Sequence, residues 1–437
     1  MERSHNLHSS FHGSFRSKES SSTTGSDPRE KIKDCLRKFI AFMFTQVGVG
    51  ALVVCYAILG AASFMHIEKD SPDMQLVKVI KWRQSCVEQL WGITNNNVCR
   101  GVNTMLPVRL RRVSGYEGRV NDVIFRPAIS DAARGRETLV FFGGDVQDYP
   151  EAMQAHRDNR HYVKWNLEST ARMLGENFVD KHIVVVRPSR IEFKSFSCYD
   201  NFVPSNNAGV PDHTPTHHAL IHLERLLKNV SIRMKTMSER ELLDVLRDVS
   251  AEGGLEGCRP AERQEPSSAR DPLWWRESLA LDEGSISLVG FSKGCVVLNQ
   301  IIYEFHYTQT LTPGDEHMMR LSGRISDMYW LDGGHAGGKN TWLTARSLLE
   351  TIATRGVNIY IHVSPYQIKD ESRPWIGREE KIFSSLLKKL GAKVHRYTHT
   401  PPGPQSLHMH FSVLGNFKHI QDSNPGQSAD SDEDTSN

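Results

Sequence analysis

Cysteine is scarce in this sequence, and its few cysteines follow no disulfide or metal-ligand pattern. The chain has seven cysteines among 437 residues, and none of them forms a CxxC pair. An odd and scattered set of this kind predicts neither a disulfide framework nor a zinc site. We therefore expect no metal, and no sequence motif implies a cofactor. The cysteines are Cys35, Cys55, Cys86, Cys99, Cys198, Cys258 and Cys295.

A strong charge imbalance is also missing. The 53 Lys and Arg residues nearly balance the 51 Asp and Glu residues, which leaves a formal net charge of +2. Proteins that bind nucleic acid usually carry a dense basic stripe, and none is visible, so we expect no nucleic-acid partner. Composition departs from the average mainly at the ends. Residues 1–30 are rich in Ser and His, and 421–437 form an acidic tail; both compositions predict disorder.

Long apolar stretches are absent, with one exception. Residues 40–65 contain no charged side chain, and a membrane-spanning helix needs about 20 apolar residues. A cluster of Lys and Arg precedes this stretch and Glu68 follows it, so the positive-inside rule places the N-terminus in the cytoplasm. We expect a transmembrane anchor within 31–70 that contacts the membrane through 40–65. A linker or cap-like helix is expected over 71–120.

From about residue 120 onward, short apolar runs alternate with helix-like segments. This alternation is typical of a mostly parallel sheet covered by helices on both faces, so we expect an α/β domain over 121–420. A flexible insertion is expected at 248–275, where turn-forming residues are frequent. The expected strands are 139–142, 182–186, 285–289, 328–331, 357–363 and 392–397. The expected helices are 166–175, 216–230, 296–307, 342–354 and 377–390.

One of these strands leads directly into the sequence Gly290-Phe291-Ser292-Lys293-Gly294. At such a strand-to-helix turn the serine Oγ is lifted clear of the sheet, and the glycines permit a sharp bend. The amide of Lys293 then points at a developing oxyanion. The five-residue pattern is weak by itself, but a buried strand precedes it and an apolar helix follows it. It predicts that Ser292 is the nucleophile of an α/β-hydrolase-like fold.

Residues at the ends of other strands complete the predicted catalytic set. Gly144 follows the first clear strand, where such folds supply a second oxyanion donor. Two aspartates follow later strands: Asp370 is in the usual position and is preferred, and Asp332 is the alternative. Beyond the last strand, His410 is the first choice for the base and His408 the second. The chain order of nucleophile, acid and histidine is the one that the fold requires.

Together these residues predict a serine hydrolase. The histidine takes the proton of Ser292 as it attacks an ester, thioester or amide carbonyl, and the acid orients the imidazole. The expected substrates are small-molecule or lipid-like acyl compounds. The alternative is a non-catalytic interaction protein that has kept the hydrolase scaffold, because a fold does not determine a function.

The N-terminal part of the chain resembles a known membrane-protein family. Residues 30–97 contain Gln46-Val-Gly-Val-Gly-Ala-Leu and Leu90-Trp-Gly-Ile-Thr, which are similar to the first transmembrane and early cap segment of two-pore-domain potassium channels. Such a channel needs a Thr-x-Gly-Tyr/Phe-Gly filter of stacked carbonyls. Neither a filter nor a second apolar span follows, so a channel function is disfavoured. Gene fusion or an error in the gene model is one explanation for this segment.

A second resemblance covers residues 138–412 and rests on longer blocks. They include Phe196-Ser-Cys-Tyr-Asp-Asn-Phe-Val, Gly290-Phe-Ser-Lys-Gly-Cys-Val-Val-Leu-Asn-Gln and Met328-Tyr-Trp-Leu-Asp-Gly-Gly-His. These blocks closely resemble a poorly characterised animal family named after chromosome 2 open reading frame 69. The resemblance implies a hydrolase-like fold, mitochondrial targeting and no settled substrate. Family members begin with their own leader, whereas this chain has the channel-like anchor. Two locations are therefore expected: a membrane, through a single span, or the mitochondrion.

Overall fold

The computed structural model describes residues 33, 36 and 37, 106–130, 137–246, 273–315 and 320–423. The predicted anchor at 40–65, the N-terminal segment 1–30 and nearly all of the predicted acidic tail lie outside these residues. Among the helices that are described, none combines the length and the apolar character that crossing a bilayer requires. The chain divides into two units, and the fold belongs to the second, Asn103–Asn437.

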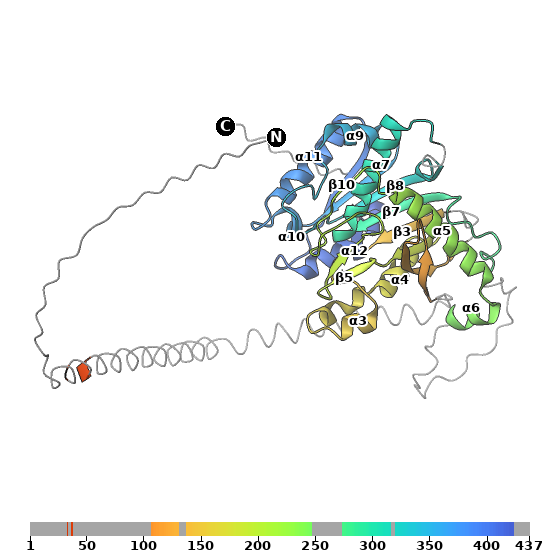
Figure 1. Ribbon diagram of the computed structural model, residues 1–437, viewed down its shortest axis with the longest axis horizontal. Helices are drawn as coiled ribbons and strands as arrows, with labels where there is room; N and C mark the ends of the chain where they lie inside the picture. The colour runs from red at the N-terminus through yellow and green to blue at the C-terminus, as the bar shows by residue number, and fades with distance from the viewer. Residues whose placement is uncertain are drawn as a thin grey trace, which may run out of the picture. The chain divides into compact units, whose positions relative to one another are not determined.

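An eight-stranded sheet in the order β1-β2-β4-β3-β7-β8-β9-β10 forms the centre of this unit (Figure 1). The strands from β4 to β10 in this order run parallel, whereas β2 is antiparallel to both of its neighbours. The predicted α/β fold with a mostly parallel sheet is therefore confirmed. The strands are Val108–Ser114 (β1), Val120–Arg126 (β2), Glu137–Phe142 (β3), His182–Val186 (β4), Ser285–Phe291 (β7), Ile325–Leu331 (β8), Asn358–Val363 (β9) and Lys393–Thr398 (β10).

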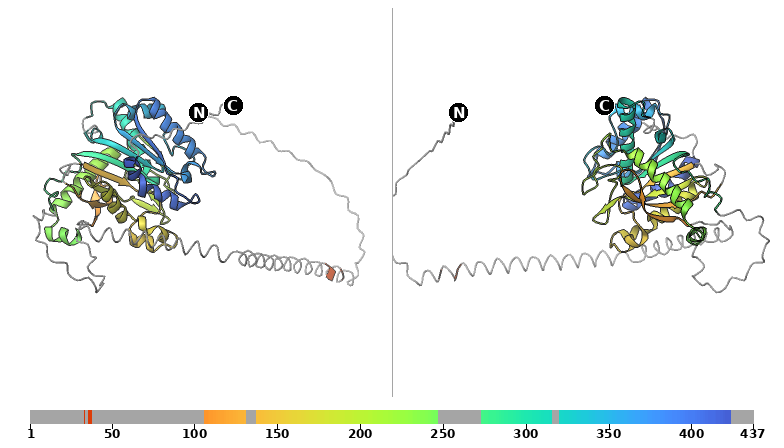
Figure 2. Two further views of the ribbon diagram at one scale, coloured as in Figure 1. Left: turned by 180° about the vertical axis from the view of Figure 1, so that it is seen from behind. Right: turned by 45° about the vertical axis from the view of Figure 1, so that its right-hand side comes forward.

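Helices cover both faces of the sheet, as Figure 2 shows from two further directions. Buried side chains of α4 and α12 pack on one face, and those of α5, α7, α9 and α11 pack on the other. A short hairpin of β5 (Arg190–Glu192) and β6 (Phe196–Cys198) forms a separate two-stranded sheet. The main helices are α4 (Leu167–Asn177), α5 (Ala219–Thr236), α7 (Cys295–Leu311), α9 (Arg346–Ala353), α11 (Trp375–Lys389) and α12 (Leu407–Ser423). The shorter ones are α3 (Pro150–Gln154), η1 (Asn159–Trp165), α6 (Glu239–Leu246), η2 (Ser292–Gly294) and α10 (Pro365–Ile368).

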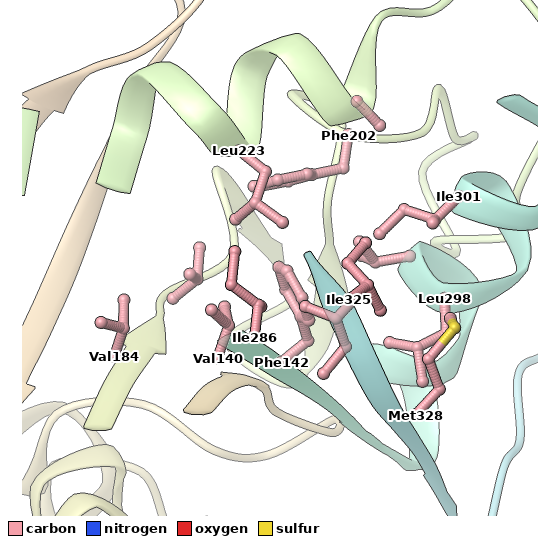
Figure 3. Close-up of a cluster of buried hydrophobic side chains, with 14 of the residues drawn as sticks. Val140, Phe142, Val184, Phe202, Leu223, Ile286, Leu298, Ile301, Ile325 and Met328 are labelled. Carbon is pink, nitrogen blue, oxygen red and sulfur yellow. The ribbon is translucent and has the colours of Figure 1, made fainter. Parts of the chain in front are cut away.

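The alternation of side chains along each strand divides the core into two layers. In β3, Val140 and Phe142 belong to the layer under α5 and α7, whereas Leu139 and Phe141 belong to the layer under α4 and α12. Figure 3 shows the first layer, in which Ile286 of the neighbouring strand joins them. Burial of one such side chain contributes about 1.5–3 kcal/mol relative to exposure. A slip by one residue would exchange the two faces, so these layers fix the strand register.

The sheet begins earlier in the chain than the sequence predicts. β1 lies within 71–120, where a linker or cap-like helix is expected, and it pairs with β2 in an antiparallel register. The register shifts between Leu110 and Val113, and positive φ at Arg112 interrupts the alternation there. Charged residues and an irregular register give an edge strand a weak periodic signal. The α/β domain therefore begins near Val108 and not at residue 121.

The structure also differs from the sequence prediction at the end of the expected insertion, 248–275. Leu273 and Trp275 are buried, and the ring of Trp275 packs against Phe125 with a centroid separation of 5.4 Å. The last residues of the segment are therefore part of the core. Residues 247–272 lie outside the described residues.

Candidate active site

Ser292 directly follows β7 and is the first residue of η2, which leads into α7. Its backbone φ is +53°, a left-handed conformation that costs a residue with a side chain on the order of 1 kcal/mol and is typical of a nucleophile elbow. The flanking glycines explain why the turn fits. A Cβ at Gly294 would lie 2.0 Å from the carbonyl oxygen of Phe142, and one at Gly290 would lie 2.9 Å from the backbone of Cys295. The side chain of Ser292 is nearly buried at the end of the central strand.

The carboxylate beside His410 is that of Asp332, which directly follows β8. His410 Nδ1 donates to Asp332 Oδ2 at 2.7 Å. Ser364 donates twice to the same carboxylate, from its N–H to Oδ1 at 2.7 Å and from its hydroxyl to Oδ2 at 2.6 Å. Asp332 is fully buried, and these three hydrogen bonds give both of its carboxylate oxygens a partner. Because the carboxylate accepts from Nδ1, the imidazole Nε2 is left as a proton acceptor.

Asp370, the acid that the sequence favours, has other partners. Its carboxylate accepts from the N–H of Ser372 at 2.9 Å and from Nε of Arg373 at 2.7 Å. The short helix α10 separates Asp370 from the end of β9, so this aspartate does not directly follow its strand. The structure thus brings the alternative, Asp332, to the histidine and leaves Asp370 in a local ion pair.

His410 lies in the first turn of α12, and its ring is held against the residue before Ser292. It stacks on Phe291, the neighbour of Ser292, with ring centroids 4.5 Å apart. The ring centroid of Tyr366 also lies 5.2 Å from that of His410. His408 instead packs edge-on against Trp165 at 5.1 Å and lines a groove of about 320 Å³ between α4 and α12. The structure therefore brings His410, and not His408, to the elbow.

Gly144 lies close to the nucleophile, but its amide is already engaged. A Cβ at Gly144 would lie 2.8 Å from Cβ of Ser292, so the loop after β3 packs directly on the elbow. The N–H of Gly144, the predicted oxyanion donor, donates to Oε1 of Gln147 at 2.9 Å. The N–H of Val146 donates to a carbonyl of the β5–β6 hairpin at 2.7 Å. Between them, Asp145 has an amide with no acceptor among the described residues.

The other predicted donor, the amide of Lys293, belongs to the second residue of η2. N–H groups in the first turn of a helix have no acceptor within the helix, and this turn begins at the nucleophile itself. The arrangement is compatible with the predicted role. Among the described residues, no group of three or more His, Cys, Asp or Glu side chains is placed to hold a metal ion.

Two residues of the site are absent from the sequence prediction. Ser364 is the residue after β9, and its only sequence signal is a polar residue before a proline at the end of a buried strand. The sequence does not indicate whether the amide of Gly144 or that of Asp145 is available as an oxyanion donor. The answer depends on which of the two amides donates to Gln147. Both residues are recognised only from their hydrogen bonds.

Comparison with known proteins places the chain in a family. The model of the family described as C2orf69 matches residues 109–393. The relatives include "Mitochondrial protein C2orf69 homolog" of Mus musculus, which is 38% identical over 65% of this chain and 78% of its own length. The Danio rerio homolog is 36% identical over 71% of this chain and 85% of its own length. "Mitochondrial protein C2orf69" of Homo sapiens is 36% identical over 63% and 72%. The predicted family resemblance is confirmed, whereas the channel-like segment lies outside the described residues.

Solved structures with a related arrangement include esterases at low similarity. Esterase Est22 is 11% identical, with a TM-score of 0.36 over 72% of this chain and 81% of its own length. The Bacillus cereus carboxylesterase is 12% identical, with a TM-score of 0.32 over 69% and 94%. The fold assignment rests on the strand order and the elbow geometry described above.

Proposed function

The chain belongs to the C2orf69 family, and we propose that it is a serine hydrolase with the triad Ser292, His410 and Asp332. The substrates are esters, thioesters or amides of small-molecule or lipid-like acyl groups. The observation that carries the proposal is the buried hydrogen bond of 2.7 Å between His410 Nδ1 and Asp332 Oδ2, formed beside a serine at φ +53°.

In the proposed mechanism, His410 Nε2 takes the proton of Ser292 Oγ as the oxygen attacks the acyl carbonyl. Asp332 holds the tautomer with the proton on Nδ1 and stabilises the imidazolium that forms. The amides of Lys293 and Asp145 donate to the oxyanion. His410 then protonates the leaving group, and water hydrolyses the acyl-enzyme. Asp332 replaces Asp370, and Asp145 replaces Gly144, in the set predicted from sequence.

Labelling with a fluorophosphonate tests the proposal. We expect the native chain to be labelled and Ser292→Ala to remain unlabelled, because the probe reacts with an activated serine. Ser385→Ala is the matched control, since Ser385 is an exposed serine on α11. Circular dichroism establishes that each variant is folded. Absence of labelling in the folded native chain would reject the hydrolase and favour the scaffold alternative.

For the location, we propose the mitochondrion, since the three relatives above are named mitochondrial proteins. We propose in addition that 40–65 anchors the chain in a membrane, with the hydrolase domain beginning near Val108. Fractionation of cells that express the tagged full chain tests both statements. Recovery of the chain outside mitochondria would contradict the first. Release from membranes by alkaline carbonate would contradict the second.

A further inference from the structure

Lys293 has an unusual environment for a lysine. It directly follows the nucleophile, and its side chain is fully buried. The ammonium Nζ donates to the carbonyl oxygens of Ala208 and Gly209, each at 3.2 Å, and lies 3.8 Å from Oδ2 of Asp145. An ammonium is costly to bury even when it is paired, and an apolar side chain of similar volume often fills such a space with better stability. The buried ammonium of Lys293 is therefore better explained by the groups that it holds in position than by a gain in stability.

Asp145 is held from two directions. Its Oδ1 accepts the N–H of Ser197 at 2.8 Å, and the hydroxyl of Ser197 donates to the carbonyl of Gly144 at 2.9 Å. Its Oδ2 faces the ammonium of Lys293. The loop after β3 is thus tied to the β5–β6 hairpin on one side and to the nucleophile elbow on the other.

The same two residues carry the amides of the proposed oxyanion hole. Lys293 contributes the amide after the nucleophile, and Asp145 contributes the amide without an acceptor in the facing loop. The ion pair between their side chains therefore links the two amide donors. This link does not involve the oxyanion itself. Donors of an oxyanion hole act only when they lie 2.7–3.1 Å from the position of the developing charge, so the separation of these two segments must be held closely.

We propose that the ion pair between Lys293 and Asp145 positions the two amide donors of the oxyanion hole. This inference rests on the proposed function. Both side chains are positioning residues, because they act through the backbone amides that would contact the oxyanion. Lys293 also secures the loop 206–210 over the elbow, where a Cβ at Gly209 would lie 3.0 Å from Nζ and 2.9 Å from a backbone carbonyl oxygen of β6.

A double-mutant cycle tests the pairing. Asp145→Asn keeps an acceptor for the Ser197 amide but removes the charge, and Lys293→Met keeps a long apolar stem without the ammonium. The full chain is assayed for the rate of fluorophosphonate labelling and for kcat and KM on p-nitrophenyl butyrate. Loss of one oxyanion donor reduces kcat by about 10²–10³, and we expect a displaced donor to reduce kcat by about 10–100-fold. KM should change by less than about threefold, because the donors act on the transition state.

The double variant should be no slower than the slower single variant, because both changes break the same pair. Arg346→Met with Glu350→Gln, which removes an exposed ion pair on α9, is the matched control and should leave kcat unchanged. Multiplicative losses, a change in KM alone, or an unchanged kcat in folded Asp145→Asn would each overturn the inference. If Lys293→Met does not fold, the result for Asp145→Asn decides alone. Failure of the native chain to label at Ser292 would instead overturn the proposed function, and the inference with it.

Discussion

The loops after β8 and β9 each carry an aspartate at the same edge of the sheet, but they place it in different environments. Asp332 directly follows its strand, adopts a positive φ of 48° and is fully buried beneath His410. Asp370 follows a short helix, and its side chain, 19% exposed, pairs with Arg373 of its own loop. The comparison shows that the order of the two aspartates in the chain does not determine which carboxylate is hydrogen bonded to His410. The burial of the side chain and the way it points determine this partner.

Replacement of the buried aspartate should have the largest effect. In Asp332→Asn the imidazole loses the partner that holds the proton on Nδ1, so we expect kcat for p-nitrophenyl butyrate to fall by about 10⁴-fold. Steady-state kinetics on the folded variant measures this loss. A loss of less than about tenfold would mean that another carboxylate supports His410, and the comparison between the two loops would then fail.

Acid should destabilise the region beneath the Asp332 loop. The N–H of Asp332 donates to the carbonyl of His362, and His362 is hydrogen bonded to His399 at 2.9 Å between ring nitrogens. Burial lowers the pKa of His399 to about 4. Between about pH 6.5 and pH 4, His399 is therefore protonated in the unfolded state but neutral in the folded state.

The free energy of unfolding should accordingly fall as the pH drops through this window. One pKa unit corresponds to about 1.4 kcal/mol, so His399 contributes at most roughly 3 kcal/mol to this fall. Urea unfolding at several pH values measures it. The slope should be shallower in His399→Gln, which has no imidazole at position 399, and an unchanged slope would assign the effect to other groups.

Loss of one donor to the Asp332 carboxylate should have a smaller effect. Ser364→Ala removes the hydroxyl bond to Oδ2 and leaves the backbone N–H bond to Oδ1. A hydrogen bond to a charged group is worth about 1.5–3 kcal/mol, so we expect kcat to fall by about 10–100-fold. Ser385→Ala serves as the control in the same assay. Equal rates in the two variants would show that Ser364 does not orient the acid.

The smallest effect is expected for the other aspartate. Asp370→Asn breaks the pair with Arg373, and partly exposed ion pairs contribute only about 0–1 kcal/mol to stability. We expect kcat to stay within about twofold of the native value and the urea midpoint to move little. A loss comparable to that of Asp332→Asn would restore Asp370 as the catalytic acid.

Several parts of the fold could be predicted because their signals are local. A sheet covered on both faces is predicted by apolar runs that alternate with helices. These runs are those of β3, β4, β7 and β8. β1 escaped prediction because an edge strand with charged residues and an irregular register lacks periodicity. The sequence places Trp275 in an insertion, because its polar flanks outweigh one aromatic residue whose partner, Phe125, is met only in the folded chain.

For the site, the sequence predicts Ser292 as the nucleophile, because the glycines around it are required by a turn whose geometry is local. It also narrowed the base to two histidines and the acid to two aspartates. The choice between them depends on contacts of the folded chain, as does the bond by which Gln147 occupies the amide of Gly144. The reason is physical: a triad and an oxyanion hole are made where the ends of separate strands meet. Which donors and acceptors face one another there depends on the paths of the loops between them.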